Sequence, residues 1–287
     1  MIPGLYYVDK SNNNQIKLLI DRYFLTKLNQ TMGLYFKQVQ NLDSYLLKSE
    51  LLGSKVVKRL DHFAIITDGE DQTVVSDVPI VIDNGKFGGL FEKTKYRVVD
   101  LNNTELISER MRDMFLNCDS SEIHLTGMKV PMLKDVSYML NMTDITQYKG
   151  PHVVTMDGII TKQVTKSDGM INTCINLKYL SMKDSDTSNI ESMQFMFDDC
   201  TELEQIEGLE NFTSTNLKNT YGMFNGCFAL KNIDMSNFDM TTVQQYDSMF
   251  AYCAKLETIV FKKAITDKKE LKYMLGNISK VKIISKT

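Results

Sequence analysis

The cysteines are the residues of this chain whose chemistry has to be settled first. There are five of them: Cys118, Cys174, Cys200, Cys227 and Cys253. Thiolates that bind zinc or exchange disulfides commonly form CxxC pairs, whereas successive cysteines here lie a full repeat apart. An odd number also cannot pair completely within one chain. The sequence therefore predicts reduced thiols buried as small hydrophobic groups, and no zinc or redox site.

The cysteines belong to a repeat. Each stands four residues after a Met that is followed by Phe, Leu or Ile, and this Met unit occurs seven times, with Thr143 and Ile278 replacing Cys in two copies. A fixed period of this length is typical of stacked repeats, so we expect the last four cysteines to form a buried ladder. The units begin at Met114, Met139, Met170, Met196, Met223, Met249 and Met274, with spacings of 25, 31, 26, 27, 26 and 25.

Other residues that could carry chemistry do not form a recognisable site. The histidines, His62, His124 and His152, are far apart and lack the spacing of HExxH. Residues 85–89 are glycine-rich but lack the GxxxxGK[ST] phosphate loop, and the acidic residues of 198–207 lack EF-hand spacing, which favours a solvated face. We therefore expect no catalytic residue, no metal and no cofactor. The alternative is an enzyme with its site in residues 54–105.

Residues 1–105 show no repeat and are expected to form a small α+β module with a helical arm. Residues 16–28 carry apolar side chains at three- and four-residue steps, with Ser11 or Asn12 as the cap, and a second helical stretch from Leu42 ends near Gly53. Strands are expected at 62–66, 73–75, 80–82 and 96–99. The pairs at 68–69 and 84–85 predict turns, and the second favours a hairpin.

Residues 106–287 are expected to form an α/β solenoid of leucine-rich-repeat type with a parallel sheet, so the fold class of the chain is predicted as α+β. After each Cys an apolar triplet such as Leu230, Ile233 and Met235 spells L-x-x-L-x-L, which predicts a short strand. Before each Met the apolar residues have helical spacing, which predicts a short helix. The 31-residue step after Met139 predicts an inserted loop or hairpin.

Residues 223–243, MFNGCFALKNIDMSNFDMTTV, closely resemble the BspA-like leucine-rich repeat of bacterial and protist surface proteins and some phage proteins. The resemblance covers about residues 114–285, most clearly 170–261. It implies a curved solenoid that binds proteins, and it implies no catalytic residues.

Composition limits the classes of partner. A hydrophobic content of 43% is enough for a sizeable core, and a net charge of −3 argues against nucleic acid and an anionic membrane surface as partners. The sequence contains no run of about eighteen apolar residues, so no membrane span is expected. The N-terminus lacks the pattern of a secretory signal. These features predict a virion or cytoplasmic location, with the cell surface as the alternative.

The functional hypothesis is a non-catalytic structural or interaction protein that uses the repeats as a binding scaffold. By analogy with phage repeats we expect a virion component, such as a tail, baseplate or portal-proximal part, with other subunits of a large assembly as partners. A bacterial surface adhesin with a protein or glycan ligand is the alternative. Strand alternation predicts the exposed partner-binding face, whose residues are Tyr179, Ser181, Gln205, Glu207, Asn232, Asp234, Thr258 and Val260. Docking by the arm at residues 16–28 is the competing interpretation.

Overall fold

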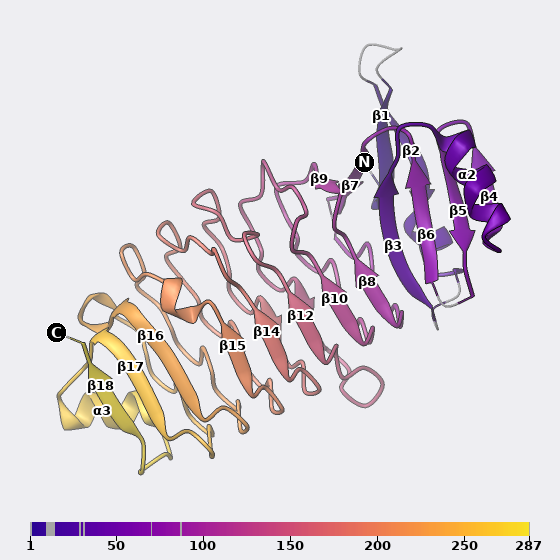
Figure 1. The fold of residues 1–287 in the computed structure, drawn as a ribbon. Coiled ribbons are helices and arrows are strands. Elements are labelled where there is room, and N and C mark those ends of the chain that lie inside the picture. Colours follow the sequence, from indigo (N-terminus) through magenta and orange to yellow (C-terminus); the bar gives the residue numbers. More distant parts are fainter. Residues whose placement is uncertain are drawn as a thin grey trace.

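The computed structural model describes residues 2–9, 15–28, 30, 32–69, 71–86 and 88–286. The molecule is elongated, with a β-rich module at its N-terminal end and a stack of repeats that runs from this module to the C-terminus (Figure 1). The elements of the N-terminal module are β1 (Gly4–Asp9), β2 (Gln15–Asp21), α1 (Arg22–Leu25), β3 (Gly33–Gln38), α2 (Leu42–Leu51), β4 (Lys55–Leu60), β5 (Phe63–Thr67), β6 (Asp71–Ser76) and β7 (Ile80–Asp83).

The repeat stack consists of short strands, two single turns of 3-10 helix and one α-helix. Its elements are β8 (Val98–Asp100), β9 (Glu105–Leu106), β10 (Glu122–His124), β11 (Leu140–Asn141), β12 (Val153–Thr155), β13 (Ile171–Asn172), β14 (Tyr179–Ser181), β15 (Gln205–Glu207), η1 (Leu209–Asn211), β16 (Asn232–Asp239), η2 (Met240–Thr242), β17 (Thr258–Lys263), α3 (Lys268–Leu275) and β18 (Lys282–Ser285).

A nine-stranded mixed sheet connects the N-terminal module to the repeats. Its order is β15-β14-β12-β10-β8-β3-β6-β5-β4, and the joint is the parallel pairing of Leu34 on β3 with Val99 on β8. From β8 to β15 all neighbours are parallel and one repeat apart. One cluster of buried apolar side chains extends from Leu5 to Met274, so the core also continues across this joint.

The expected pairing of the last repeats is confirmed. Ile233 and Met235 lie on β16 opposite Ile259 and Phe261 of β17, in a parallel register. All four side chains are buried, as the L-x-x-L-x-L pattern predicted. Leu230 is also buried but lies just before the strand.

The expected α+β class with an α/β solenoid is wrong. The chain is mostly β: its strands form separate sheets of nine, four, three and two strands, and its α-helices have only four, ten and eight residues. The helix expected before each Met forms only in the last unit, as α3, and consecutive tight turns take its place in the other six.

Backbone conformation explains why these segments are turns. In the first six Met units the residue before the Met, the third residue after it, or both have φ near +50° to +72°, a region that a continuous right-handed helix excludes. Tight turns with such positions reproduce the three- and four-residue spacing of buried side chains without a helix. The residues concerned are Asp113, Asn117, Tyr138, Gly169, Thr173, Phe195, Asp199, Gly222, Gly226, Ser248 and Tyr252.

Successive Met units are joined by a ladder of backbone hydrogen bonds along the stack. The residue after each Met donates its amide to the carbonyl of the next Met, for example Phe197 to Met223 at 2.9 Å and Phe224 to Met249 at 2.8 Å. Aromatic rings stack in the same direction. The ring centroids of Phe197 and Phe224 are 5.2 Å apart, and those of Phe224 and Phe250 are 5.4 Å apart. Each repeat therefore covers the one before it.

The helical arm expected at residues 16–28 is also wrong. Its first part, residues 16–21, belongs to strand β2, which pairs antiparallel with β1, and only the four residues of α1 are helical. Cross-strand pairing here outweighs the helical spacing of the apolar residues. The expected caps, Ser11 and Asn12, lie outside the described residues. The second helix is confirmed as α2, with Asn41 as its N-cap and Gly53 at φ 95° just after its end.

One of the two expected turns of the module is a hairpin and the other is not. Residues 68–69 lie in the connection between β5 and β6, which pair antiparallel. By contrast, β7 pairs with β1 and β9, so the hairpin expected at Asn84 is wrong. The buried side chain of Asn84 instead donates to the carbonyl of Arg112 at 2.8 Å and accepts from the amide of Leu90 at 3.3 Å, which anchors the following loop.

The expected cysteine ladder is confirmed. All five cysteines are buried and free, and the last four donate their thiols to carbonyl oxygens of the preceding repeat. The acceptors are Leu140 for Cys174 at 3.7 Å, Ile171 for Cys200 at 3.5 Å, Phe197 for Cys227 at 3.0 Å and Phe224 for Cys253 at 3.0 Å. Thr143 does not occupy the ladder: it is exposed in the inserted loop and bonds to Asn117.

We expect thiol reagents to modify native protein much more slowly than unfolded protein. Burial raises the pKa of the Cys118, Cys174 and Cys227 thiols, and that of Cys253 to about 12, so almost no thiolate is present near neutral pH. Labelling with a maleimide, with and without denaturant and followed by mass spectrometry, measures the difference. Rapid modification of the native protein would contradict the buried ladder.

Candidate functional site

The predicted face is formed by outward side chains of neighbouring parallel strands. Tyr179 lies opposite Gln205, and Ser181 lies opposite Glu207. Further along, Asn232 lies opposite Thr258, and Asp234 lies opposite Val260. The structure therefore brings the eight residues together as two groups, one on β14 and β15 and one on β16 and β17. We call the outward side chains of β10, β12, β14, β15, β16 and β17 the strand face.

Glu207 is the centre of the first group. Its carboxylate accepts hydrogen bonds from the Tyr179 hydroxyl at 2.8 Å and the Gln205 amide at 2.9 Å, and it pairs with Lys183 Nζ at 2.5 Å. The bond from Lys183, followed by that from Tyr179, lowers the pKa of Glu207. Burial, followed by the bond to Glu207, raises the pKa of Tyr179. Glu207 is therefore a fixed anion on this surface.

Ser181 was expected to contact a partner, but it is only 2% exposed. Its hydroxyl donates to Asp157 Oδ1 at 2.5 Å, and the same oxygen accepts the amide of Lys183 at 2.8 Å. Asp157 belongs to the turn after β12, so it reaches Ser181 from the preceding repeat. Ser181 therefore supports the face from beneath and is not an exposed contact.

The strand face continues toward the N-terminus through residues that the sequence analysis did not select. On β10 the His124 ring lies between Glu122, whose carboxylate is 3.0 Å from Nε2, and Thr155 on β12, whose hydroxyl is 2.9 Å from Nδ1. A hydroxyl, an imidazole and a carboxylate are the groups of a hydrolytic triad, but a triad acts on a substrate held in a pocket with oxyanion donors. These three side chains lie along two strands of the sheet face. The alternation Glu122-Ile123-His124 was the signal that could have identified them.

The strand face is interrupted between β15 and β16. These strands belong to different sheets, and a hollow of about 430 Å³ lies between their repeats. The predicted residues Gln205 and Asn232 both line it. The other lining residues are Glu204, Ile206, Ala229, Lys231 and Lys255. Amide, carboxylate and ammonium groups beside a small apolar floor are suited to recognising a polar ligand or a loop of another protein.

A local irregularity explains the interruption. β15 ends at Glu207, whereas β16 continues to Asp239. Gly208 follows with φ 93°, and a Cβ on it would lie 2.5 Å from the Met182 carbonyl, so only glycine fits there. The chain then forms η1, and buried Leu209 takes the place of the missing third apolar residue.

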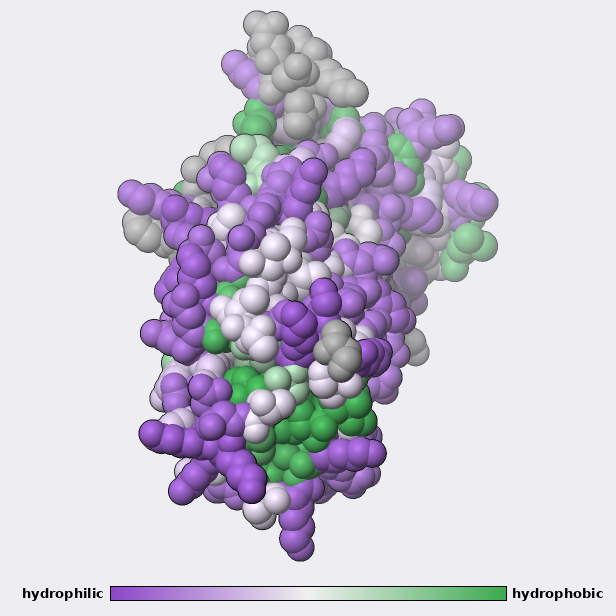
Figure 2. Space-filling view, turned by 90° about the vertical axis from the view of Figure 1, so that its left-hand side faces the viewer, coloured by the Kyte–Doolittle hydropathy of each residue, from purple (hydrophilic) through white to green (hydrophobic). Residues whose placement is uncertain are grey.

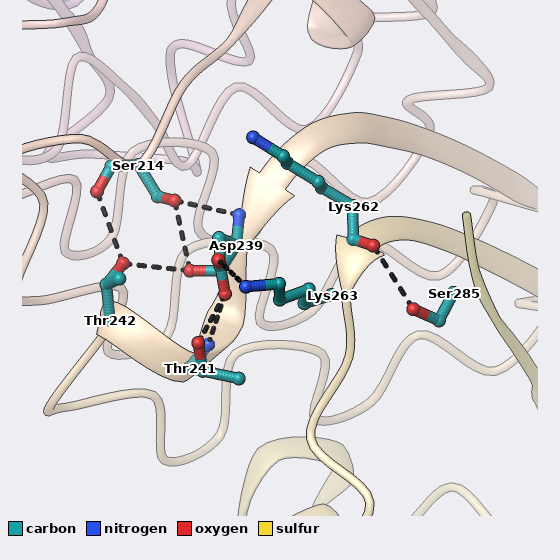
Figure 3. A network of polar contacts seen from close by, with 7 residues as sticks. All are labelled: Ser214, Asp239, Thr241, Thr242, Lys262, Lys263 and Ser285. Carbon is teal, nitrogen blue, oxygen red and sulfur yellow. Dashed lines mark hydrogen bonds and ion pairs between the residues drawn. The ribbon is translucent and has the colours of Figure 1, made fainter. Parts of the chain in front are cut away.

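Polar contacts fix the far ends of the last strands (Figure 3). The Ser214 hydroxyl both donates to the Asp239 carbonyl at 3.0 Å and accepts the Asp239 amide at 2.8 Å, which joins two repeats. The Asp239 carboxylate accepts from Thr241 Oγ1 at 2.5 Å and pairs with Lys263 of the next repeat at 3.4 Å. These contacts hold β16 and β17 in register.

A second hollow, of about 570 Å³, lies where the turns of four successive repeats meet, and sequence reasoning missed it. Arg112 stacks over the Tyr138 ring at 4.7 Å, and Asp168 contributes a buried Oδ1 that has no hydrogen-bond partner among the described residues. The lining residues that carry charge are Arg112, Asp135, Lys166, Asp168 and Glu191. No signal in the sequence placed these residues together, because they come from the turns and not from the patterned strands.

The other residues that were weighed for a functional role in the sequence make contacts within the fold. His62 lies 3.1 Å from Asp77 and packs on the Tyr7 ring. Asp198, expected on a solvated face, is half-buried and bonds to Asn225 at 2.7 Å, and burial raises its pKa. No group of three or more potential metal ligands occurs in the described part of the chain. Within the same residues, no helix is long and apolar enough to cross a bilayer.

Residues 145–267 match the model of a family described as Mycoplasma protein of unknown function, DUF285. No curated protein and no solved structure matches this chain. The matched segment includes β12, β14, β15, β16 and β17, so the similarity covers most of the strand face.

Proposed function

We propose that this chain is a non-catalytic interaction protein that binds a partner through the strand face. The observation that carries the proposal is the row of outward side chains on β14 and β15, where Tyr179 and Gln205 hold the Glu207 carboxylate in one position. Side chains held before binding lose less conformational entropy when a partner arrives. The hollow beside Gln205 and Asn232 adds a recess into which a partner group can insert.

The nature of the partner follows from this surface chemistry. Amides, hydroxyls and a fixed carboxylate suit a protein loop or a glycan. The resemblance to BspA-like repeats supports a binding role, whereas the family matched by residues 145–267 is described as of unknown function. Within the proposal the chain is a subunit of a larger assembly such as a phage virion, and a cell-surface adhesin is the alternative. Finding the protein in purified particles, or on intact cells by surface labelling, separates the two.

Reversing the charge of Glu207 and Asp234 together is expected to weaken partner binding about tenfold or more, because a charged contact is replaced by a repulsive one. Binding of the Glu207→Lys/Asp234→Lys protein to its native assembly, or to a glycan panel, is compared with wild type by surface plasmon resonance. The control is Glu109→Lys/Asp247→Lys, which makes the same charge change at exposed residues outside the strand face. Unchanged binding by a folded Glu207→Lys/Asp234→Lys protein would contradict binding through the strand face and indicate a contact site on the N-terminal module.

A further inference from the structure

The C-terminal end of the stack exposes apolar side chains at positions that earlier repeats keep covered. In the preceding repeat these positions are fully or almost fully buried by the next one. At the end they are only half-buried. The end residues Ile278, Val281 and Ile283 correspond to Cys253, Leu256 and Ile259. An outer surface of a repeat stack that faces water is normally polar, whereas this one carries apolar side chains.

The apolar area is continuous with the last helix. Leu271 and Leu275 of α3 are also half-buried and pack against the same core. Figure 2 looks onto this end of the molecule and shows an apolar area over the last repeats, with hydrophilic side chains around it. We call Leu271, Leu275, Ile278, Val281 and Ile283 the end patch.

Strand β18 gives the end patch an open backbone edge. It is the last strand of the order β16-β17-β18 and pairs only with β17. The amides of Lys282 and Lys286 donate to the carbonyls of Glu257 and Phe261, at 2.8 and 3.0 Å. Backbone groups alternate in direction along a strand, so the amide of Ile283 points to the open side. An extended segment can add to such an edge as a new strand.

Charge is strongly uneven along the chain, although its net value is only −3. Residues 261–286 contain eight lysines and only two acids, Asp267 and Glu270. The lysines are Lys262, Lys263, Lys268, Lys269, Lys272, Lys280, Lys282 and Lys286. Lys263 and Lys286 pair with Asp239 and Asp234, whereas none of the ion pairs within the described residues involves Lys280 or Lys282, which flank the end patch. The surroundings of the patch are therefore basic.

We propose that the C-terminal end of the stack binds an acidic, extended segment of a partner protein, which pairs with β18 and covers the end patch. Alternate apolar side chains of the segment pack on Ile278 and Ile283, and its carboxylates face Lys280 and Lys282. This occupant satisfies the open backbone edge, the apolar surface and the positive charge together.

Two other occupants satisfy fewer of these features. A second copy of the chain would bring two lysine clusters together, which is repulsive. A lipid surface would attract the lysines, but hydrocarbon cannot satisfy the open edge of β18, since unpaired backbone groups are costly in lipid. Strand addition by an acidic segment is therefore the arrangement that the structure favours.

The test uses a fluorescein-labelled peptide that alternates Glu with Ile and Val. Fluorescence anisotropy is expected to show binding to the wild-type protein that weakens as salt is added. The Lys280→Glu/Lys282→Glu protein is expected to bind about tenfold more weakly or worse, because two attractions become repulsions. The matched control, Lys149→Glu/Lys162→Glu, changes the same charge at exposed lysines of earlier repeats and is expected to bind like wild type. Circular dichroism verifies that both variants are folded.

A second peptide isolates the strand pairing. N-methylation of alternate amides removes the donors needed for a ladder but keeps the charges and side chains, so its binding is expected to be lost. Absence of binding to wild type, equal binding by both lysine variants, or equal binding of the methylated peptide would overturn the proposal. So would binding to vesicles of phosphatidylcholine and phosphatidylglycerol without peptide binding, or dimerisation of wild type that Lys280→Glu/Lys282→Glu abolishes.

Discussion

Replacement of Cys227 by lysine is expected to unfold the repeats around it. The Cys227 side chain is fully buried, and its thiol donates to the Phe197 carbonyl at 3.0 Å. A lysine there would place an ammonium inside the apolar core, which costs several kcal/mol. Since a whole domain is stable by only about 5–15 kcal/mol, one such change is enough to lose the native state at this point. Urea unfolding followed by circular dichroism measures the loss.

The control for this substitution is Phe228→Lys, one residue further along the chain. Phe228 is 44% exposed, so the same charge there remains in water. Its effect on the free energy of unfolding is expected to be small, within about 0.5 kcal/mol. Equal stability of Cys227→Lys and Phe228→Lys would show that the cysteine ladder is not buried.

Truncation of Phe224 to alanine is expected to cost about 3–5 kcal/mol. Its ring is fully buried and lies between Phe197 and Phe250, with centroid distances of 5.2 and 5.4 Å. Removing it leaves a cavity and interrupts the aromatic row, so the free energy of unfolding falls. The midpoint of urea unfolding reports this change, with Phe228→Ala as the exposed comparison in the same repeat. A loss below about 1 kcal/mol would contradict a rigid packed row.

The repeat period located the strands of the stack correctly but gave the wrong structure between them. Ile233 and Ile259 could be predicted to face the core because alternation and period agreed. The helix was predicted from spacing alone, and consecutive tight turns produce the same spacing. Asp113, Asn117 and Gly222 were the missed signal, since Asp, Asn and Gly tolerate positive φ best.

The N-terminal module was harder to predict because its pairings join distant segments. β2 has apolar residues at helical steps, yet its partner β1 and the contact of β1 with β7 determine its conformation. No local pattern contains that information. The second helix, α2, was predictable because both its cap and its apolar face are local.

The candidate site could be predicted only where it follows the alternation of a strand. Tyr179 and Glu207 were found in this way, whereas Lys183 and Asp157 belong to turns and were missed. The hollow beside β15 depends on the irregularity at Gly208, whose effect on the sheet was not foreseen. The basic C-terminal end was not predicted, because the net charge of −3 sums positive and negative residues that are unevenly distributed along the chain.

The ladder between Met units also has a consequence for the order of folding. Its hydrogen bonds, such as Phe224 to Met249, join residues about one repeat apart, whereas β1 must find β7 across most of the module. Contacts between near neighbours form quickly, and long loops close slowly. Two adjacent repeats can therefore serve as a nucleus from which the stack lengthens in both directions, while the N-terminal sheet closes last.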